Sequence, residues 1–301
     1  MRLQKKIKFS QGQIEEIAGY LFILPWIIGF IAFQFGPLVA AFVISFTRWT
    51  VLAPPVFSGL KNYQELVSDP LFWQSLKVTV VYTGGNISIR IGLGMVAALL
   101  VNQKIKGIGI YRTLYYLPAV VPTIALSILW LGILAPFGLV NYIFSVFDLP
   151  NQMWLKNSDT ALLGLILLNI WGIGVSMVVF LGALQGIPVF LYEAADVEGA
   201  SSWQKFWKIT FPMISPMILL TLIVNFVGSF QSFTQAYVIT DGGPSNSTLF
   251  YILYLYRQSF QYLHMGYGCT LAVMLFIFIL FLTLIVVKSS SLWVFYRAEK
   301  K

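Results

Sequence analysis

Long apolar segments alternate with short polar segments along the whole chain. A helix needs about 20 residues to cross the hydrocarbon core of a bilayer, and its backbone must be hydrogen-bonded internally there. One segment of that length, 78–103, contains a single charged residue, Arg90. Segments of that length without any charged residue occupy 17–47, 113–147, 160–192, 209–240 and 258–287. The pattern predicts six membrane-crossing helices.

The predicted fold class is therefore an all-α membrane protein with six transmembrane helices. Since no long stretch has the charge content of a soluble domain, residues 1–301 are expected to form a single transmembrane domain. A polar loop, 185–212, separates the fourth helix from the fifth. In chain order, the predicted helices occupy 17–46, 76–101, 111–134, 161–184, 213–240 and 268–290.

The distribution of lysine and arginine predicts the orientation of the helices. If both termini are cytoplasmic, thirteen basic residues lie in the inner segments and five in the outer segments. Cytoplasmic loops are enriched in Lys and Arg, so both termini and the loop 185–212 are predicted to be cytoplasmic. The apolar run after the basic N-terminus is about twice as long as the core of a secretory signal, which favours a retained first helix.

Composition agrees with the membrane class and narrows the possible partners. Hydrophobic residues make up 58% of the chain and charged residues 10%, and the mean hydropathy is +0.81. A net charge of +8 could suggest nucleic-acid binding, but the basic residues lie mainly in the inner loops. The lipid bilayer is therefore an expected partner and nucleic acid is not. The single cysteine, Cys269, excludes an intramolecular disulfide.

The loop 185–212 has the pattern of two short helices joined by a turn. Pro188 suits the first position of a helix, and Glu193 is expected near the positive N-terminal end of that helix. Gly199 permits a backbone reversal with φ > 0. Ser201, followed three residues later by Gln204, predicts a capping box at the start of the second helix.

The second of these helices is predicted to be amphipathic. An apolar stripe at helical spacing would suit docking in the groove of a partner protein, or resting on lipid headgroups. Physical reasoning alone leaves both alternatives open. The stripe consists of Trp203, Phe206, Trp207 and Phe211, opposite Lys205 and Lys208.

The order of residues in this loop resembles the cytoplasmic coupling loop of binding-protein-dependent ABC importers, where the membrane subunit contacts its ATPase. The resemblance rests on the sequence EAA, a following glycine, and an isoleucine two residues before an aromatic-proline pair. The matching residues are Glu193, Ala194, Ala195, Gly199, Ile209 and Pro212.

Further motifs along nearly the whole chain resemble the sugar-type permeases of these importers, the maltose-transporter-like (carbohydrate uptake type 1) family. The sequence departs from the family pattern at Lys77, where Asn is common, at Phe211, which replaces Leu, and at 269–270, where small residues are usual. The matching motifs are 59–63 (GLKNY), 69–73 (DPLFW), 112–118 (RTLYYLP), Pro122, Trp130, Gly138, Asn141, 241–244 (DGGP) and 267–268.

This resemblance implies the type I ABC importer permease fold and a place in a bacterial or archaeal cell membrane. The implied partners are a second, homologous permease in a heterodimer, a dimer of ABC ATPases, an extracellular solute-binding protein and a carbohydrate. The sequence contains no phosphate-binding G-x-x-x-x-G-K-S/T motif. The chain is therefore predicted not to be an enzyme and to hold no cofactor, with ATP and Mg²⁺ bound by the partner ATPase.

Polar residues in the fourth and fifth helices are candidates for the path of a solute. Amides and hydroxyls can hydrogen-bond a sugar, and aromatic faces can stack on its ring, although amides can equally hold membrane helices together. By the resemblance, Ser229, Gln231 and Ser232 lie where maltose-type permeases carry sugar-binding residues, and Gln231 is the best single candidate. The remaining candidates are Asn225, Phe233 and Gln235 in the fifth helix, and Asn169, Trp171 and Gly172 in the fourth.

Arg90 is the one charged residue in the middle of a predicted helix. An arginine at mid-membrane costs at least about 2.5 kcal/mol, so its side chain should face protein or water rather than lipid. It could recognise an acidic or polar solute, such as a uronate oligomer. Alternatively, it could make a structural bond to helix-terminal carbonyls or to Asn86.

Three other functions are compatible with parts of this pattern. One is an ABC permease for a non-sugar solute such as a glycerophosphate. Another is an ion-coupled secondary transporter, but such proteins usually need carboxylates within the membrane, and the predicted helices contain none. A purely structural scaffold would leave the polar residues of the fifth helix unexplained.

Overall fold

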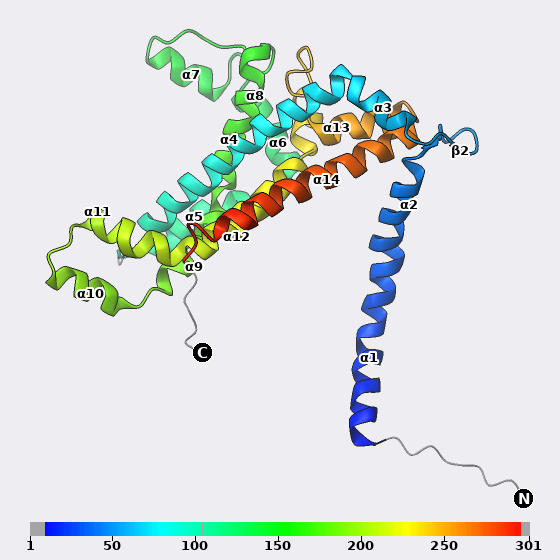
Figure 1. Cartoon of the computed structure of the whole chain (residues 1–301). Helices are drawn as coiled ribbons and strands as arrows, with labels where there is room; N and C mark the ends of the chain where they lie inside the picture. The colour runs from blue at the N-terminus through cyan, green and yellow to red at the C-terminus, as the bar shows by residue number, and fades with distance from the viewer. Residues whose placement is uncertain (1–9, 104, 296–301) are drawn as a thin grey trace, which may run out of the picture.

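The computed structural model describes residues 10–103 and 105–295, which fold almost entirely into helices (Figure 1). Within this part, five continuous helical segments are long and apolar enough to cross a membrane, and a bent pair of helices makes up to a sixth. This confirms the predicted class, an all-α membrane protein. Basic residues at positions 2–8, 104 and 297–301, which entered the predicted orientation, lie outside the described residues.

Several crossing segments combine α-helices with a short π-helix or 3₁₀-helix, labelled η. The crossing segments are α1 (Gln11–Phe30), η1 (Ile31–Phe35) and α2 (Gly36–Ile44); α4 (Pro70–Val101); α5 (Ile108–Val120) and α6 (Thr123–Ile133); α8 (Ser158–Leu167), η2 (Leu168–Gly172) and α9 (Ile173–Gln185); α11 (Ser202–Lys205), η3 (Phe206–Thr210) and α12 (Phe211–Phe230); and α14 (Met265–Ser290). The shorter elements are the antiparallel pair β1 (Thr47–Arg48) and β2 (Val56–Phe57), α3 (Lys61–Ser68), α7 (Leu139–Val146), α10 (Val189–Val197), η4 (Ala236–Thr240), α13 (Tyr251–Tyr256) and η5 (Arg257–Gln261).

Two helices differ from the prediction. The third is not straight: α5 and α6 meet at an angle of 100°. Pro122 lacks a backbone N–H and holds Val121 in an extended conformation (φ −74°, ψ 133°), which ends α5. The fifth ends at Phe230 rather than at 240, because the chain turns at Gln231 before it resumes as η4.

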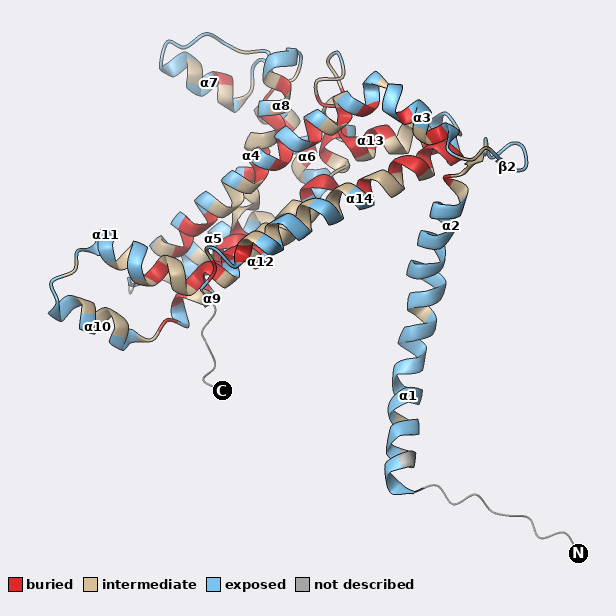
Figure 2. Ribbon diagram, viewed as in Figure 1, coloured by how far each residue is buried: buried red, intermediate tan, exposed pale blue. Residues whose placement is uncertain are grey.

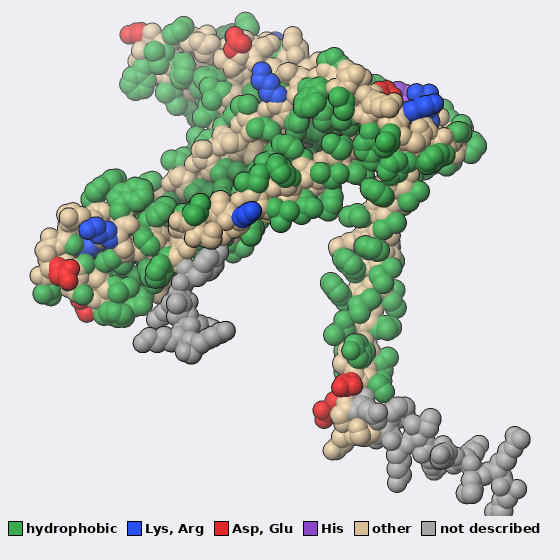
Figure 3. Space-filling view, viewed as in Figure 1, with side chains coloured by type: hydrophobic (Ala, Val, Ile, Leu, Met, Phe, Trp, Pro, Cys, Tyr) green, Lys and Arg blue, Asp and Glu red, His purple; other side chains and the backbone are tan. Residues whose placement is uncertain are grey.

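The first crossing segment, α1 to α2, diverges from the bundle as a separate arm (Figure 1). In its most apolar stretch, 0% of the residues are buried within the chain (Figure 2), and hydrophobic side chains cover its surface (Figure 3). The arm joins the bundle only at its C-terminal end. There Asn62 Nδ2 donates to the carbonyls of Ser45 and Thr47 at 2.9 Å each, and Thr270 Oγ1 donates to Ser45 O at 3.1 Å.

The bundle has two hydrophobic clusters, one towards each end. The end that carries α3, α7 and α13, predicted to face outward, is called the outer end here. Its cluster contains Tyr82, Phe230 and Phe250, all at most 1% exposed. The cluster of the inner end, near α10 and α11, contains Met177 and Ile214, both 0% exposed. The polar residues described below lie where these two clusters meet.

Asp69 ties three elements together at the outer end. Its Oδ1 accepts from Leu71 N at 2.9 Å and so caps α4. Its Oδ2 accepts the hydroxyl hydrogens of Tyr254 and Tyr267, the latter at 2.6 Å. Burial, and then the bond to Asp69, raise the pKa of Tyr254, which therefore remains a neutral donor.

The aromatic segment 250–267 packs on α4 and α14 at the outer end. Phe250, Tyr251 and Leu253 are at most 1% exposed, whereas Phe260 and Tyr262 remain exposed. Tyr251 is fixed in place by hydrogen bonds at both ends: Thr79 Oγ1 accepts from its N–H, and Leu271 O accepts from its hydroxyl, each at 2.8 Å.

A single amide, Asn141, organises the outer loop that contains α7. Its Nδ2 donates to the carbonyls of Ala135, Pro136 and Gln152 at 3.3, 3.0 and 2.9 Å. Its Oδ1 accepts from Gln152 N at 3.0 Å and from Trp154 Nε1 at 3.2 Å. Because Asn141 is 2% exposed and bonded at both ends of its amide, it holds α7 in a fixed position beside α6.

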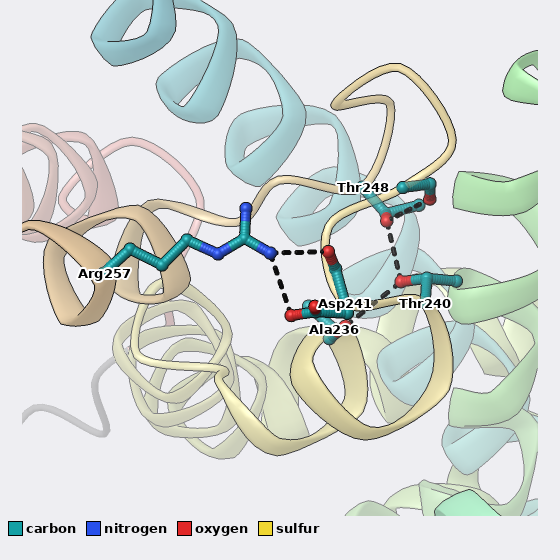
Figure 4. Close-up of polar contacts among 6 residues, drawn as sticks. Ala236, Thr240, Asp241, Thr248 and Arg257 are labelled. Carbon is teal, nitrogen blue, oxygen red and sulfur yellow. Dashed lines mark hydrogen bonds and ion pairs between the residues drawn. The ribbon is translucent and has the colours of Figure 1, made fainter. Parts of the chain in front are cut away.

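The turn at 241–244 is similarly held by polar contacts (Figure 4). Arg257 Nη2 donates to the backbone carbonyl of Asp241 at 2.8 Å and to its carboxylate at 2.9 Å. Thr240 and Thr248 share a hydrogen bond of 2.7 Å across the turn. The residues DGGP form a sharp turn, with Asp241 and Gly242 both at positive φ.

Candidate functional site

A column of polar residues runs along one face of α4 at the centre of the bundle. Tyr82, Asn86 and Arg90 are four residues apart, so they lie one above another on the helix. Each contacts a polar side chain from α12 or from the segment that follows it. Tyr82 Oη donates to Gln235 Oε1 at 2.5 Å, Asn86 Nδ2 to Ser229 Oγ at 2.5 Å, and Arg90 Nη1 to Asn225 Oδ1 at 3.3 Å.

The irregular turn η2 contributes the third side of this site. Asn169 Nδ2 donates to Tyr82 Oη at 3.3 Å and to the carbonyls of Leu165 and Ile166. Trp171 contacts Trp130 edge to face, with ring centroids 5.5 Å apart. The fourth-helix candidates from the sequence therefore lie next to the polar column.

Between these elements is a small cavity of about 180 Å³. Polar and aromatic groups lie on one side of it, and α5 and α6 close the other. Its lining includes Arg90, Asn169, Trp171, Gly172 and Gln235, with Pro118, Ala119, Val121, Thr123 and Leu126 opposite. Two polar atoms of the column, Arg90 Nε and Asn86 Oδ1, are buried without a hydrogen-bond partner in the described part of the chain.

Arg90 is not held by helix-terminal carbonyls or by Asn86, as the structural alternative supposed. Its side-chain partner is Asn225, one helix away. The reason is geometric: Asn86 lies a turn back on the same helix and donates to Ser229 instead. The guanidinium faces protein rather than lipid, as its desolvation cost requires.

The fifth-helix candidates divide into two groups. Asn225 and Ser229 form hydrogen bonds with the polar column of α4. Gln231 is exposed at the end of α12 and is not among the residues that line the cavity. Phe233 stacks on Tyr237, with ring centroids 5.0 Å apart. Ser232 is partly buried in the turn between α12 and η4.

Tyr82 and Asn86 were not among the residues chosen from the sequence as the site. Tyr82 lies in an apolar run, where a tyrosine is usually a packing residue. The spacing of Tyr82, Asn86 and Arg90 was the available signal, since three polar residues at intervals of four define one face of a helix. Gln235 was a candidate, but Gln231 was preferred to it, and it is Gln235 that lines the cavity.

A second, wider cavity of about 540 Å³ opens at the outer end. It lies against the C-terminal half of α6 and the end of η4, whereas the cavity of about 180 Å³ touches the N-terminal half of α6. Both cavities therefore border α6. The lining of the outer cavity includes Leu131, Leu134, Trp154, Lys156, Ile239, Thr240 and Pro244.

The loop 185–212 forms a helix, a tight turn and a second helix at the inner end (Figure 1). Gly199 has φ +75°, which confirms the predicted reversal. Ser201 and Gln204 form the predicted capping box, with Gln204 Oε1 accepting from Ser201 N at 2.8 Å. Lys205 Nζ lies 2.6 Å from Asp196 Oδ1 and links the two helices.

Two details of the loop were predicted wrongly. Pro188 precedes α10 rather than opening it, and Glu193 lies beyond the first turn of α10, so it gains little from the positive helix end. The aromatic stripe is confirmed: the rings of Trp203 and Trp207 contact at 5.7 Å, and those of Trp207 and Phe211 at 5.2 Å. Trp203 and Trp207 remain exposed. A shallow hollow of about 340 Å³ beside Gly199 faces the same end.

Comparison with known proteins identifies the family. Residues 90–291 match the family described as "Binding-protein-dependent transport system inner membrane component". The chain belongs to this family. It is a multi-pass membrane protein whose matched region begins at Arg90 and includes α9, the loop 185–212, α12 and all of α14.

Several relatives match over nearly their whole length. The Bacillus subtilis protein "Probable ABC transporter permease protein YesP" is 38% identical, over 95% of this chain and 94% of the relative. "Arabinooligosaccharides transport system permease protein AraP" of Bacillus subtilis is 33% identical (92% and 90%), and "Trehalose/maltose transport system permease protein MalF" of Thermococcus litoralis is 32% identical (95% and 96%).

A solved structure shares the fold. One chain of a bacterial ABC transporter involved in the import of the acidic polysaccharide alginate superposes with a TM-score of 0.80 at 23% identity, covering 92% of this chain and 96% of that chain. A second crystal structure, of the bacterial alginate ABC transporter with a pentasaccharide-bound periplasmic protein, gives a TM-score of 0.79.

Proposed function

We propose that this chain is the membrane-spanning permease subunit of an ATP-driven importer, and that it moves a sugar or oligosaccharide delivered by an extracellular solute-binding protein. The observation that carries the proposal is the polar column of α4, with its cavity, buried among membrane-crossing helices. Burying this many amides and hydroxyls within membrane-crossing helices is unfavourable unless they form hydrogen bonds with one another or with a polar solute.

The chemistry of the cavity suits a carbohydrate. Asn169 and Gln235 offer amides, and Trp171 offers an aromatic face beside them. Relatives that match almost full-length are named as permeases for arabino-oligosaccharides and for trehalose and maltose. These names support a sugar rather than a glycerophosphate as the solute of this chain.

The loop 185–212 is proposed as the contact with the ATPase dimer. Glu193, Ala194 and the exposed rings of Trp203 and Trp207 present a mixed polar and aromatic surface at the inner end. ATP binding, with its Mg²⁺, would close the two ATPase subunits and draw the loops of both permeases together. The helices would then rock about the cavity and expose it alternately to the two sides.

The arm supports the proposal of a second permease. In the most apolar stretch of the arm, 0% of the residues are buried within the chain. This stretch must therefore be covered by lipid or by another protein. A homologous subunit in a heterodimer would cover part of the arm. The assembly is proposed to lie in a bacterial or archaeal cell membrane.

The outer cavity is the proposed mouth of the path. It lies between the fixed loop of Asn141 and the turn held by Arg257, so its walls are pre-organised for a docked binding protein. A closed, sugar-loaded binding protein would favour the outward-open state by binding it more tightly.

The test is to isolate the affinity-tagged chain from its native membrane and identify the proteins that co-purify. An ATPase and a homologous permease are expected. After reconstitution in liposomes, ATP hydrolysis should rise several-fold with a sugar-loaded binding protein and remain basal with the empty one. Uptake that needs an ion gradient but no ATP would instead support a secondary transporter and overturn the proposal.

A further inference from the structure

Arg90 has no acidic partner among the residues that the structure describes. In the described part, the ion pairs are Lys205 with Asp196 and Arg257 with Asp241, both at the ends of the bundle. The bond from Arg90 to Asn225 is to a neutral amide at 3.3 Å, and it occupies only Nη1. A desolvated guanidinium is therefore left with its full charge uncompensated.

Arg90 lines the cavity, and one edge of its guanidinium is unpaired. Nε is buried without a partner, and no hydrogen bond from Nη2 occurs among the described residues. Nε and Nη2 together form the side of an arginine that binds a carboxylate through two parallel hydrogen bonds. Gly172 makes room for the guanidinium beside the cavity, because a β-carbon there would lie 2.7 Å from Nη2.

The groups around this edge fit a sugar acid better than a phosphate. Trp171 supplies a ring face, and Asn169 and Gln235 supply amides for hydroxyl groups. Arg90 is the sole cation in the lining, whereas a phosphate dianion usually recruits several basic groups or a row of backbone N–H groups.

We propose that Arg90 binds the carboxylate of an acidic sugar, and that the substrates of this importer are uronate-containing oligosaccharides. This inference rests on the proposed function and names its substrate class. Asn225 holds Nη1, and Nε and Nη2 are left without a partner among the described residues. The charge that the folded chain leaves unpaired is neutralised only when an acidic solute is bound.

The probes are digalacturonate and the matching neutral disaccharide, galactobiose, which carries a hydroxymethyl group in place of each carboxylate. Binding of each is measured to the assembled importer without its binding protein, so that the preference belongs to the permeases. The wild type should prefer the acid by roughly 10- to 100-fold, as expected for a charge-assisted pair. Arg90→Gln should remove this preference while galactobiose still binds.

Three further variants separate this role from others. Arg90→Lys keeps the charge but loses the bidentate geometry, so it should retain part of the preference. Lys288→Gln removes one exposed positive charge at the end of α14, remote from the cavity, and should leave the acid-to-neutral ratio unchanged. Asn225→Ala releases Nη1 but keeps the charge of Arg90, so it should retain part of the preference, whereas a helix-joining role predicts that Asn225→Ala and Arg90→Gln behave alike.

Two results would overturn the inference. One is equal binding of the two disaccharides by the wild type, or an acid preference that survives in Arg90→Gln. The other is loss of the assembled complex in both Arg90→Gln and Arg90→Lys, which would assign Arg90 to the contact with the partner permease. In the first case, sugar-stimulated ATP hydrolysis would still support the importer function, so failure of the two proposals can be told apart.

Discussion

The guanidinium of Arg90 lies where Gly172 has no side chain. A β-carbon at position 172 would be 2.7 Å from Nη2, 3.0 Å from Cζ and 3.1 Å from Nε of Arg90. The two residues come from α4 and from the irregular turn η2, which are separate crossing segments. The cavity thus depends on a charge from one helix and on an absent side chain from another.

Gly172→Ala should therefore push the Arg90 side chain away without unfolding the chain. The displaced group is the far end of a flexible side chain, so the change in the free energy of unfolding should be about 1 kcal/mol or less. Solute uptake should fall about tenfold while the complex assembles normally. Gly182→Ala on α9, where a β-carbon meets nothing within 4 Å, is the control. Equal uptake by both variants would separate Gly172 from the solute path.

Gly199→Asp should leave membrane insertion intact but abolish attachment of the ATPase. Its φ of +75° strains a residue with a β-carbon by about 1–3 kcal/mol, and the added side chain would crowd the partner surface. Gly199→Asn is the conformational control, because Asn tolerates positive φ better than most residues. The measurement is co-purification of the ATPase with the tagged permease.

Glu193→Lys should also weaken attachment, although its side chain is exposed and lies beyond the first turn of α10. The expected cause is therefore contact with the partner rather than loss of helix stability. Thermal unfolding of the isolated permease should be unchanged, while ATPase recovery and uptake fall together. A loop that only rests on lipid would instead tolerate the lysine or bind anionic lipid more strongly.

Gln231→Ala and Gln235→Ala should have different effects. Because Gln231 is a candidate for the solute path, its loss should lower uptake. Because it is exposed at the end of α12, its loss should leave assembly and stability intact. Gln235 is buried and accepts from Tyr82, so its loss leaves a buried hydroxyl with a weaker partner and should lower stability by about 1–3 kcal/mol. Uptake and thermal unfolding, measured on the same preparations, distinguish them. Loss of assembly in Gln231→Ala would support a helix-joining role.

Asn141→Ala should release the outer loop. The substitution leaves the N–H groups of Gln152 and Trp154 and three carbonyls without their partner, a loss of about 2–4 kcal/mol. In limited proteolysis, the protease should then cleave the chain between α6 and α8, where the wild type resists cleavage. The control is Asn151→Ala, a substitution of an exposed neighbour, which should resist cleavage as the wild type does.

Local features of the loop 185–212 were predictable because they depend on adjacent residues. The capping box of Ser201 and Gln204 and the reversal at Gly199 follow from residue type and spacing alone. The number of crossing segments was predictable for a similar reason, since hydrocarbon thickness fixes the length of an apolar run.

The partners of the polar residues could not be predicted, because they depend on how helices pack. Arg90 meets Asn225, and Tyr82 meets Gln235, across distances in sequence that no local pattern encodes. The bend between α5 and α6 was within reach, since Pro122 was noted, yet a proline within an apolar run often produces only a slight kink. Its sharpness is a property of the surrounding bundle.

The break between α5 and α6 has a consequence for the backbone itself. Pro122 cannot donate to Pro118 O, which accepts from Val121 N at 3.3 Å instead. Both Pro118 and Val121 border the cavity of about 180 Å³. Peptide groups freed from a helix are tolerated at membrane depth only where protein or water can satisfy them. Acceptors of this kind do not depend on side-chain identity. Side-chain substitutions around the cavity can therefore change which sugar is preferred, while the main chain continues to offer the same oxygens to its hydroxyl groups.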